Sequence, residues 1–143
     1  MSQVKKFFLV FVFTVVVDQA IKYLFTHGAG VEGSCISLVL AYNKGVAFSM
    51  FAFLGTYLKY IQVLMIAGIV GYLLLNKELL QEYAISAGLI LAGGMSNIAD
   101  RFFREGVVDY VYWHCGFDFA IFNYADVMID LGVLLILLKS FKK

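Results

Sequence analysis

Four long apolar stretches alternate with shorter polar segments along the chain. A helix needs roughly 20 mostly apolar residues to cross the ~30 Å hydrocarbon core of a bilayer. The stretches that reach this length are about 4–25, 56–75, 83–100 and 119–138. The pattern therefore predicts an all-α membrane protein, in which residues 1–143 form a single domain of four transmembrane helices.

The composition excludes several other classes of protein. Apolar residues (AVILMFWYC) make up 62% of the chain, charged residues make up 15%, and the mean hydropathy is +0.88. A soluble domain has about 45–50% apolar and about 25% charged residues. The excess would leave large apolar patches on a water-soluble fold, which excludes a soluble enzyme, and it also excludes a disordered chain. The formal charge of +1 argues against nucleic acid as a partner.

Basic residues near the helix ends predict the orientation in the membrane. The side that holds both termini carries six of them, and the other side carries three. By the positive-inside rule, both termini are then cytoplasmic. The first stretch begins like a signal peptide, but no small-x-small cleavage site follows it, so we expect a retained helix. The six residues are Lys5, Lys6, Lys77, Lys139, Lys142 and Lys143, and the three are Lys44, Arg101 and Arg104.

The two connections on the outer side, 26–55 and 101–118, are much longer than the inner one. The first contains several glycines and a strand-like run at 34–42, and the second mixes charges with aromatic residues. Long loops in a compact protein are usually functional or disordered, and these are too apolar for disorder. We therefore expect a small β-rich extracytoplasmic platform from the first loop and a partly ordered periplasmic lid from the second.

Ionisable and amide side chains inside the predicted helices gather near the outer ends. Asp, Lys or Arg at a helix centre costs roughly 2.5–3.5 kcal/mol on insertion scales, so such residues are functional candidates. Asp18 and Asp126 both lie about 10 Å inside the outer end of a helix. This common depth predicts a water-accessible cavity in the outer leaflet. The cluster comprises Asp18 and Lys22 on the first helix, Asn97, Asp100 and Arg101 on the third, and Asn123, Asp126 and Asp130 on the fourth.

These groups also have structural interpretations. Asp18 and Lys22 are four residues apart and are most simply an ion pair within the bundle, which is the role we favour. The polar residues at the end of the third helix have two interpretations of about equal weight. They are an ordinary helix end at the lipid headgroups, or they support a functional site. Asp126 is harder to explain as half of an ion pair, because the ionisable residue one turn away is Asp130, which is also an acid. Asp109, in the second outer loop, would alone be a surface carboxylate.

Asp109 and Asp126 together would support hydrolysis. Two carboxyls that lie close together cannot both ionise easily, so the pair holds one proton. One carboxylate then takes a proton from water, while the other carboxyl protonates a carbonyl or a leaving group, and no metal or cofactor is needed. The sequence permits this pairing if the segment between the two residues folds back over the bundle.

The cysteines and histidines do not indicate a metal site. Cys35, Cys115, His27 and His114 lack the spacing of zinc ligands, so we expect neither a metal nor a cofactor. Both cysteines fall on the oxidising side, where a disulfide can form. Of the two states we favour free thiols.

Five short motifs follow one another along the predicted helices and outer loops. They are Asp18-Gln-Ala-Ile-Lys22, Asn43-Lys-Gly45-Val-Ala47-Phe48-Ser49, Gly93-Gly94-Met-Ser-Asn97-Ile-Ala-Asp100-Arg101, Val107-Val108-Asp109-Tyr110 and Phe122-Asn123-Tyr-Ala125-Asp126. In this order and at these membrane positions they resemble the lipoprotein signal peptidase family, also called signal peptidase II, a family of bacterial membrane aspartyl endopeptidases. The resemblance covers nearly the whole chain, and the set of motifs is far more specific than any one of them.

The resemblance implies an activity and roles for residues. The family removes signal peptides from prolipoproteins whose cysteine carries diacylglyceryl, and it cuts on the N-terminal side of that cysteine. Asp109 and Asp126 match the family's catalytic pair. Asn43 matches a residue that contacts the substrate backbone and the cyclic peptide inhibitor globomycin, and Arg101 would hold the polar shell in order. The other supporting positions are Asp18, Lys22, Gly45, Asn97, Asp100 and Asn123.

The resemblance also implies a location and partners. The protein would be a multi-pass protein of the bacterial cytoplasmic (inner) membrane, with its active site at the outer leaflet. Its partners would be diacylated prolipoproteins, membrane lipid and inhibitors of the globomycin type, but not nucleic acid. We also expect a monomer.

Three positions depart from the family pattern. Ile21 stands where the family often has Thr, and Tyr110 stands where Phe is common. Asp130 is not part of the pattern, and we hypothesise that it influences the titration of Asp126 by like-charge repulsion. Two other functions stay open from the residues alone. One is a non-enzymatic small transporter or assembly factor with a ligand in the polar cluster, and the other is a membrane protease that acts on unlipidated helices.

Overall fold

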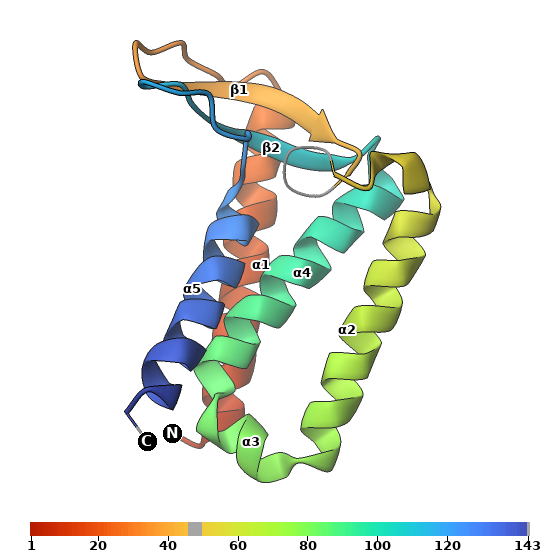
Figure 1. Ribbon diagram of the computed structural model, residues 1–143, viewed down its shortest axis with the longest axis vertical. Helices are drawn as coiled ribbons and strands as arrows, with labels where there is room; N and C mark the ends of the chain where they lie inside the picture. Colours follow the sequence, from red (N-terminus) through yellow and green to blue (C-terminus); the bar gives the residue numbers. More distant parts are fainter. Residues whose placement is uncertain (46–49, 143) are drawn as a thin grey trace.

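The computed structural model describes residues 1–45 and 50–142, so positions 46–49 of the second motif lie outside the described residues. In the described part, long helices stand side by side, a two-stranded sheet covers one end, and both termini lie at the other end (Figure 1). The elements in chain order are α1 (Gln3–Thr26), β1 (Ile36–Asn43), the 3₁₀ turn η2 (Ala52–Leu54), α2 (Tyr57–Leu75), α3 (Lys77–Glu82), α4 (Ala84–Phe103), β2 (Val107–Trp113) and α5 (Tyr124–Ser140).

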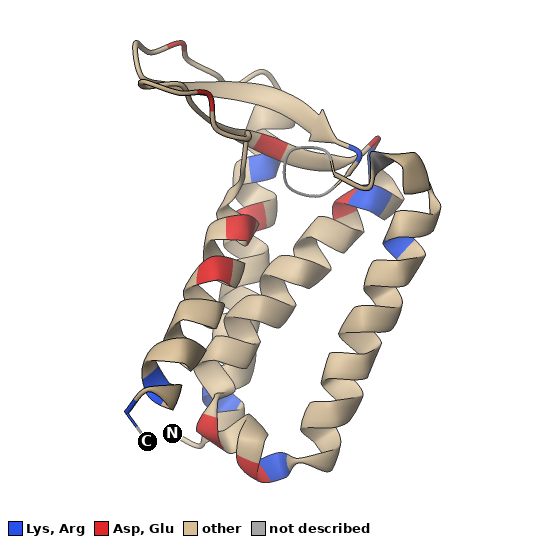
Figure 2. Cartoon of the chain, viewed as in Figure 1, with Lys and Arg blue, Asp and Glu red and all other residues tan. Residues whose placement is uncertain are grey.

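Helices α1 and α2 are long and apolar enough to cross a membrane by length and composition, with hydropathies of 1.8 and 1.9 over their most apolar windows. Only 17% and 11% of these windows are buried inside the protein, so most of their apolar side chains face outwards. Charged residues lie mainly in the sheet half of the bundle and at the end that holds the termini (Figure 2). An apolar belt between two charged ends is the distribution that a bilayer favours.

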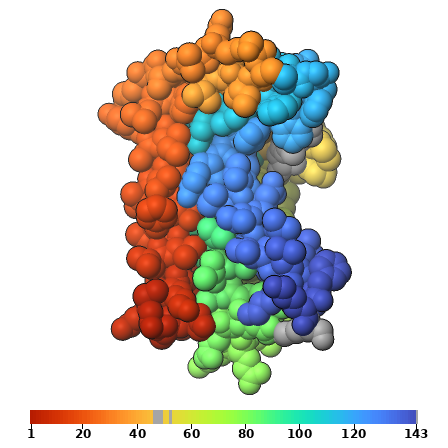
Figure 3. Space-filling view, turned by 90° about the vertical axis from the view of Figure 1, so that its left-hand side faces the viewer, coloured from red at the N-terminus to blue at the C-terminus, as the bar shows by residue number. Residues whose placement is uncertain are grey.

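Helix α4 lies at the centre of the bundle, and most of its length is buried. Small residues let its neighbours approach closely. A Cβ atom on Gly93 would lie 2.6 Å from the carbonyl oxygen of Ala125 in α5, and one on Gly88 would lie 3.1 Å from that of Phe7 in α1. On the face seen in Figure 3, α1 and α5 flank α4, which is visible mainly toward the end that holds the termini.

The outer ends of two helices differ from their predicted boundaries. Helix α4 continues to Phe103, past the predicted end at residue 100, so Arg101 belongs to the helix. Helix α5 begins at Tyr124, so the predicted start at residue 119 was wrong. The side chain of Asn123 caps the helix there, and Phe122, before the cap, pairs with Val111 of β2.

The sheet is built from both outer loops. Strand β1 pairs with β2 in antiparallel register, from Ile36 opposite Trp113 to Asn43 opposite Val107. The prediction of strands in the first loop alone was therefore incomplete. The central part of the second loop is a strand of the platform instead of a lid, because its β-branched and aromatic residues pair with those of β1.

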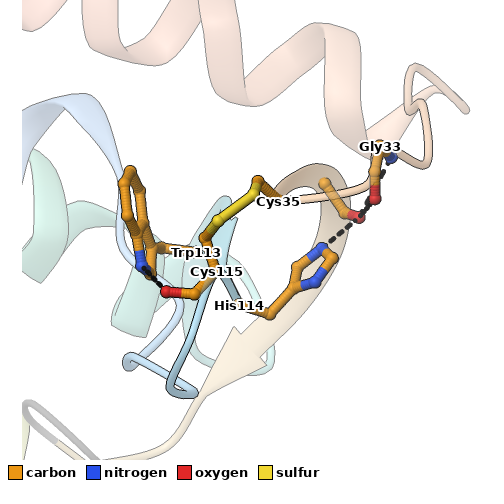
Figure 4. Close-up of a disulfide and its surroundings, with 6 residues drawn as sticks. Gly33, Cys35, Trp113, His114 and Cys115 are labelled. Carbon is orange, nitrogen blue, oxygen red and sulfur yellow. Dashed lines mark hydrogen bonds between the residues drawn. A yellow bond between two sulfur atoms is a disulfide. The ribbon is translucent and has the colours of Figure 1, made fainter.

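Cys35 and Cys115 form a disulfide, contrary to the expectation of free thiols (Figure 4). Cys35 lies just before β1 and Cys115 lies two residues after the end of β2, and the backbone N–H of His114 donates to the carbonyl oxygen of Cys35 at 2.9 Å. The pairing brings their Cα atoms to 4.4 Å, a separation that a disulfide can span. The disulfide closes the end of the sheet opposite to the pair Asn43 and Val107.

Candidate active site

Polar side chains from both strands, α2, α4 and α5 line a cavity of about 440 Å³ beneath the sheet. The rest of the wall is apolar and comes mainly from α2, α4 and the segment before α5. A peptide segment with apolar side chains could therefore lie beside a polar reaction centre. The polar residues of the wall are Asn43, Gln62, Asn97, Arg101, Asp109, Asp126 and Asp130.

Asp109 lies in the middle of β2 with only 2% of its surface exposed. Its carboxylate accepts hydrogen bonds from the side-chain amides of Asn123 at 2.7 Å and Asn43 at 3.0 Å. Burial raises the pKa of Asp109 from 3.8 to about 6, and the nearby carboxyl of Asp126 adds to the rise. The two amide hydrogen bonds and the charge of Lys22 oppose it. Asp109 can therefore hold a proton near neutral pH.

Asp126 lies in the first turn of α5, where it forms a capping box with Asn123. The backbone N–H of Asp126 donates to the side-chain oxygen of Asn123 at 2.9 Å, and the backbone N–H of Asn123 donates back to the Asp126 carboxylate at 3.1 Å. The amide of Asn97 donates to the other carboxylate oxygen at 2.8 Å. Two N–H donors, from the Asn123 backbone and the Asn97 side chain, therefore hold the Asp126 carboxyl in place.

Asn123 connects the two aspartates. Its amide nitrogen donates to Asp109 at 2.7 Å, and it also lies within hydrogen-bond distance of the Asn97 side-chain oxygen and the Val108 carbonyl oxygen. Its own oxygen caps the helix that carries Asp126. The side chain is fully buried, so its orientation is fixed by these bonds. One residue thus sets the position of both carboxyls.

Lys22 is buried in α1 beneath this pair, and its ammonium group has three acceptors. They are the carboxylates of Asp18 and Asp100, both at 2.7 Å, and the side-chain oxygen of Asn97 at 2.8 Å. An ammonium has three donors, so all of them are used. The structure therefore contains the expected ion pair of Asp18 and Lys22, with Asp100 as a second anion.

The two anions that hold Lys22 also support the segments that carry the aspartates. Asp18 accepts the backbone N–H of Ala125 in the first turn of α5 at 2.9 Å. Asp100 accepts the backbone N–H of Val108 in β2 at 3.2 Å. The ion cluster therefore fixes the start of α5 and the centre of β2 relative to α1 and α4.

Asn43 and Arg101 form the edge of the cavity near the end of β1. Besides its bond to Asp109, Asn43 accepts the backbone N–H of Gly45 at 2.9 Å. Arg101 donates to the carbonyl oxygen of Gly45 and, at 3.3 Å, to that of Asn97. The structure thus brings Asp109, Asp126 and all eight predicted supporting residues into one network.

Four further polar residues belong to this network but were not predicted. The amide of Gln19 donates to Ser96 at 2.8 Å and to Asp100 at 3.1 Å, and Arg104 donates to Asp100. The hydroxyl of Tyr110 accepts the first N–H of α5 at 2.9 Å. Among the described residues, no group of three or more His, Cys, Asp or Glu side chains could hold a metal ion.

Comparison with known protein families gives a match along nearly the whole chain. The family model described as signal peptidase (SPase) II matches residues 10–142. The lipoprotein signal peptidase of Sulfurimonas denitrificans is 60% identical over 127 residues, which are 89% of this chain and 82% of that protein. The lipoprotein signal peptidase of Helicobacter pylori (strain 26695) is 53% identical over 135 residues, which are 94% of this chain and 83% of that protein.

Two solved structures have the same fold. One is a bacterial membrane enzyme determined by the in meso method at 2.3 Å resolution, with a TM-score of 0.80 and 27% identity over 95% of this chain and 87% of the other. The second is a bacterial membrane enzyme determined by the same method at 1.9 Å resolution, with a TM-score of 0.78 and 26% identity over 96% and 93% of the two chains.

Proposed function

The chain belongs to the signal peptidase II family of aspartic-type peptidases in the bacterial inner membrane, and from this premise we propose that it cleaves diacylglyceryl-modified prolipoproteins on the N-terminal side of the lipidated cysteine. The family removes signal peptides from prolipoproteins. The proposal adds the lipid requirement, the position of the cut and the residues that carry out the reaction.

Asp109 and Asp126 act as one catalytic pair. The observation that carries this assignment is the position of Asn123, which donates to Asp109 and caps the helix of Asp126. Because the pKa of Asp109 is about 6, the pair keeps a proton at mildly acid pH, and a minority of the molecules still carries it at neutral pH. Because the two carboxyls are coupled, this proton belongs to the pair.

The reaction is general acid–base hydrolysis by a water held between the two carboxyls. The ionised carboxylate takes a proton from the water, whose oxygen attacks the scissile carbonyl carbon, while the other carboxyl protonates the carbonyl oxygen. The tetrahedral intermediate then collapses and the C–N bond breaks: the carboxyl that took the proton from water gives it to the leaving nitrogen, and the other carboxylate takes back a proton from a hydroxyl of the intermediate. Every step uses only water and the two aspartates.

The cavity offers separate contacts for the substrate backbone and for its apolar parts. Asn43 and Arg101 lie on the wall beside Asp109 and have donors for peptide carbonyl groups. The apolar wall from α2 and α4 suits the side chains of a signal peptide and the start of the acyl chains. An inhibitor of the globomycin type would occupy the same cavity.

The bundle crosses the membrane four times in this proposal, with α1, α2, α4 and α5. Both termini are cytoplasmic, the sheet is extracytoplasmic, and the protein acts as a monomer. Support comes from the apolar lengths of α1 and α2 and from the lysines at the end that holds the termini. The aspartate pair then lies in the outer leaflet, close to a bond near the headgroups.

A gel-shift assay with purified protein in detergent tests the function. We expect cleavage of a diacylglyceryl-modified prolipoprotein but not of the unmodified precursor, and no cleavage by Asp126→Asn. The matched control is Asp118→Asn, because Asp118 is an exposed aspartate of the platform that accepts a bond from Tyr112. Equal cleavage of both precursors would indicate a protease for unlipidated helices. No cleavage by folded protein would favour a ligand-binding function.

A further inference from the structure

Strand β2 is fixed to the helices at three successive residues. The backbone N–H of Val108 donates to Asp100 of α4. The carboxylate of Asp109 accepts from Asn123, and the hydroxyl of Tyr110 accepts the first N–H of α5. All three residues of the strand are also buried. Strand β2 therefore has a fixed place that does not depend on β1.

Strand β1 has fewer ties to the helices. Of its eight residues only Ser37 is buried, and its ladder of backbone bonds runs to β2. Beyond its end near the cavity, Arg101 donates to the carbonyl oxygen of Gly45. Before its other end, the disulfide joins Cys35 to Cys115. The place of β1 thus depends on its register with β2, on ties at its two ends, and on the packing of Leu38 against the cluster that contains Phe25 of α1.

The orientation of Asn43 depends on that register. Ala41 lies opposite Asp109, so Asn43, two residues further on, faces the same side of the sheet as Asp109. Between Leu38 and Ala41 a bulge gives β1 one extra residue, and the register changes there. Because side chains alternate along a strand, a slip of β1 by one residue would turn Asn43 to the other face. A two-stranded ribbon has little stability of its own, so an external tie is needed.

We infer that Cys35 and Cys115 are positioning residues for catalysis, because their disulfide holds β1 in the register that places Asn43 against Asp109. The oxidised chain is then the fully active form. The inference rests on the proposed function, in which Asp109 is catalytic. The disulfide acts from the far end of the sheet, beside His114, whose ring shares a hydrogen bond of 2.9 Å with Ser37 (Figure 4).

The chemistry requires an oxidant of a defined class. Two thiols lose two protons and two electrons when the S–S bond forms, and a disulfide-bearing thiol oxidoreductase accepts the electrons by exchange. A dithiol or phosphine reductant reverses the step. Oxidation by such a protein in the extracytoplasmic space must therefore precede full peptidase activity.

The first experiment compares the oxidised chain, the chain reduced with a phosphine, and the Cys35→Ser/Cys115→Ser variant. We expect kcat/KM to fall about tenfold on reduction, as for the loss of one hydrogen bond to a charged group, and to recover on reoxidation. The double variant should match the reduced chain and ignore the reductant. Unchanged kcat/KM after complete reduction would overturn the inference. Inactivity of the oxidised chain would instead count against the proposed function.

The second experiment asks whether the disulfide acts through Asn43. In an Asn43→Ala background, reduction should change kcat/KM by less than about twofold, because the contact it protects is already absent. A general loss of stability would lower activity by the same factor in both backgrounds, and that result would contradict a positioning role. Amide exchange at residues 40–43 should also become faster on reduction, while exchange stays slow at Val108 and Tyr110, whose N–H groups donate to Asp100 and to the Phe122 carbonyl oxygen.

The pH dependence of cleavage gives a third test of the positioning role. The bond from Asn43 lowers the pKa of Asp109, so its loss on reduction should move the acid limb of the pH–rate profile to higher pH. Among the described residues, the charged groups that face Asp109 are Asp126 of α5, Lys22 of α1 and Arg101 of α4, none of which lies on β1. A reduced chain with lower activity but an unshifted profile would contradict the role of Asn43.

Discussion

The cavity beneath the sheet and a second cavity toward the end that holds the termini have similar sizes but different walls. The first measures about 440 Å³ and contains the aspartate pair, and the second measures about 510 Å³ and is almost entirely apolar. Phe7, Leu73 and Leu91 are among the residues that line the second cavity. Size therefore does not mark the reaction centre.

The difference lies in what fixes the side chains. Beneath the sheet, the positions of Lys22, Asn123 and the aspartates follow from directional bonds between elements far apart in the chain. In the apolar half, Leu73, Ala87 and Leu91 form a buried cluster, and apolar side chains such as Phe7 and Phe11 pack against it. Substitutions beneath the sheet should therefore change activity and pH dependence, whereas those in the apolar half should change stability only.

The largest effect is expected at the aspartate pair. Asp109→Asn and Asp126→Asn should each lower kcat by about 10³-fold or more, because each removes a proton acceptor in the reaction. Steady-state cleavage of a lipidated precursor measures this, with a thermal-unfolding control for the folded fraction. Near-normal turnover in either variant would contradict the assignment of Asp109 and Asp126 as the catalytic pair.

Lys22→Met should destabilise the protein by about 3–5 kcal/mol, because it leaves the carboxylates of Asp18 and Asp100 buried without their cation. Denaturant unfolding in detergent measures the change. The matched control is Lys77→Met, at an exposed lysine on the rim of the apolar cavity, for which we expect less than about 0.5 kcal/mol. Equal losses of stability at the two lysines would contradict the claim that Lys22 stabilises the buried carboxylates of Asp18 and Asp100.

Leu91→Ala should cost about 2–5 kcal/mol, because Leu91 is only 2% exposed and its removal enlarges a cavity. The kcat and the pH–rate profile of the folded fraction should stay within about twofold of the wild type. A shifted profile would show that the apolar half contributes to the chemistry, against the distinction drawn between the two cavities.

Asp109 should make stability depend on pH. Its pKa is about 6 when folded and about 3.8 when unfolded, so between these values the folded state binds more protons. Stability should therefore fall as pH rises from about 4 to about 6, by up to about 3 kcal/mol from this group. Melting curves of the wild type and Asp109→Asn over this range isolate the contribution. Parallel pH dependences in the two proteins would contradict it.

The smallest effect concerns Asp130, which lines the same cavity as Asp126. Asp130→Asn should shift the pH–rate profile and change kcat at neutral pH by less than about tenfold, because like-charge repulsion between neighbouring acids is removed. An unchanged profile would show that Asp130 does not influence the pair.

Much of the site could be predicted because its signals are local. Long apolar runs predict helices, and the spacing of three between Asn97 and Asp100 places two members on one helix face. The same local logic could have found the start of α5, since Asn123 and Asp126 have the spacing of a capping box. The predicted start at residue 119 followed hydrophobicity alone.

The rest of the fold depends on contacts between distant segments. Strands β1 and β2 are separated by three helices, so neither loop by itself shows that the other is its partner. For the same reason the disulfide, which joins residues 80 positions apart, was not expected. The bonds of Gln19 and Arg104 likewise depend on how α1 and α4 pack together.

The most direct test of the aspartate pair is a double-mutant cycle on single-turnover cleavage of a diacylglyceryl-modified prolipoprotein. The variants are Asp109→Asn, Asp126→Asn and their combination. If the two carboxyls act as one unit, the double variant should be no more than about threefold slower than either single variant. A double variant slowed by the product of the two single losses would show independent roles and would contradict the account.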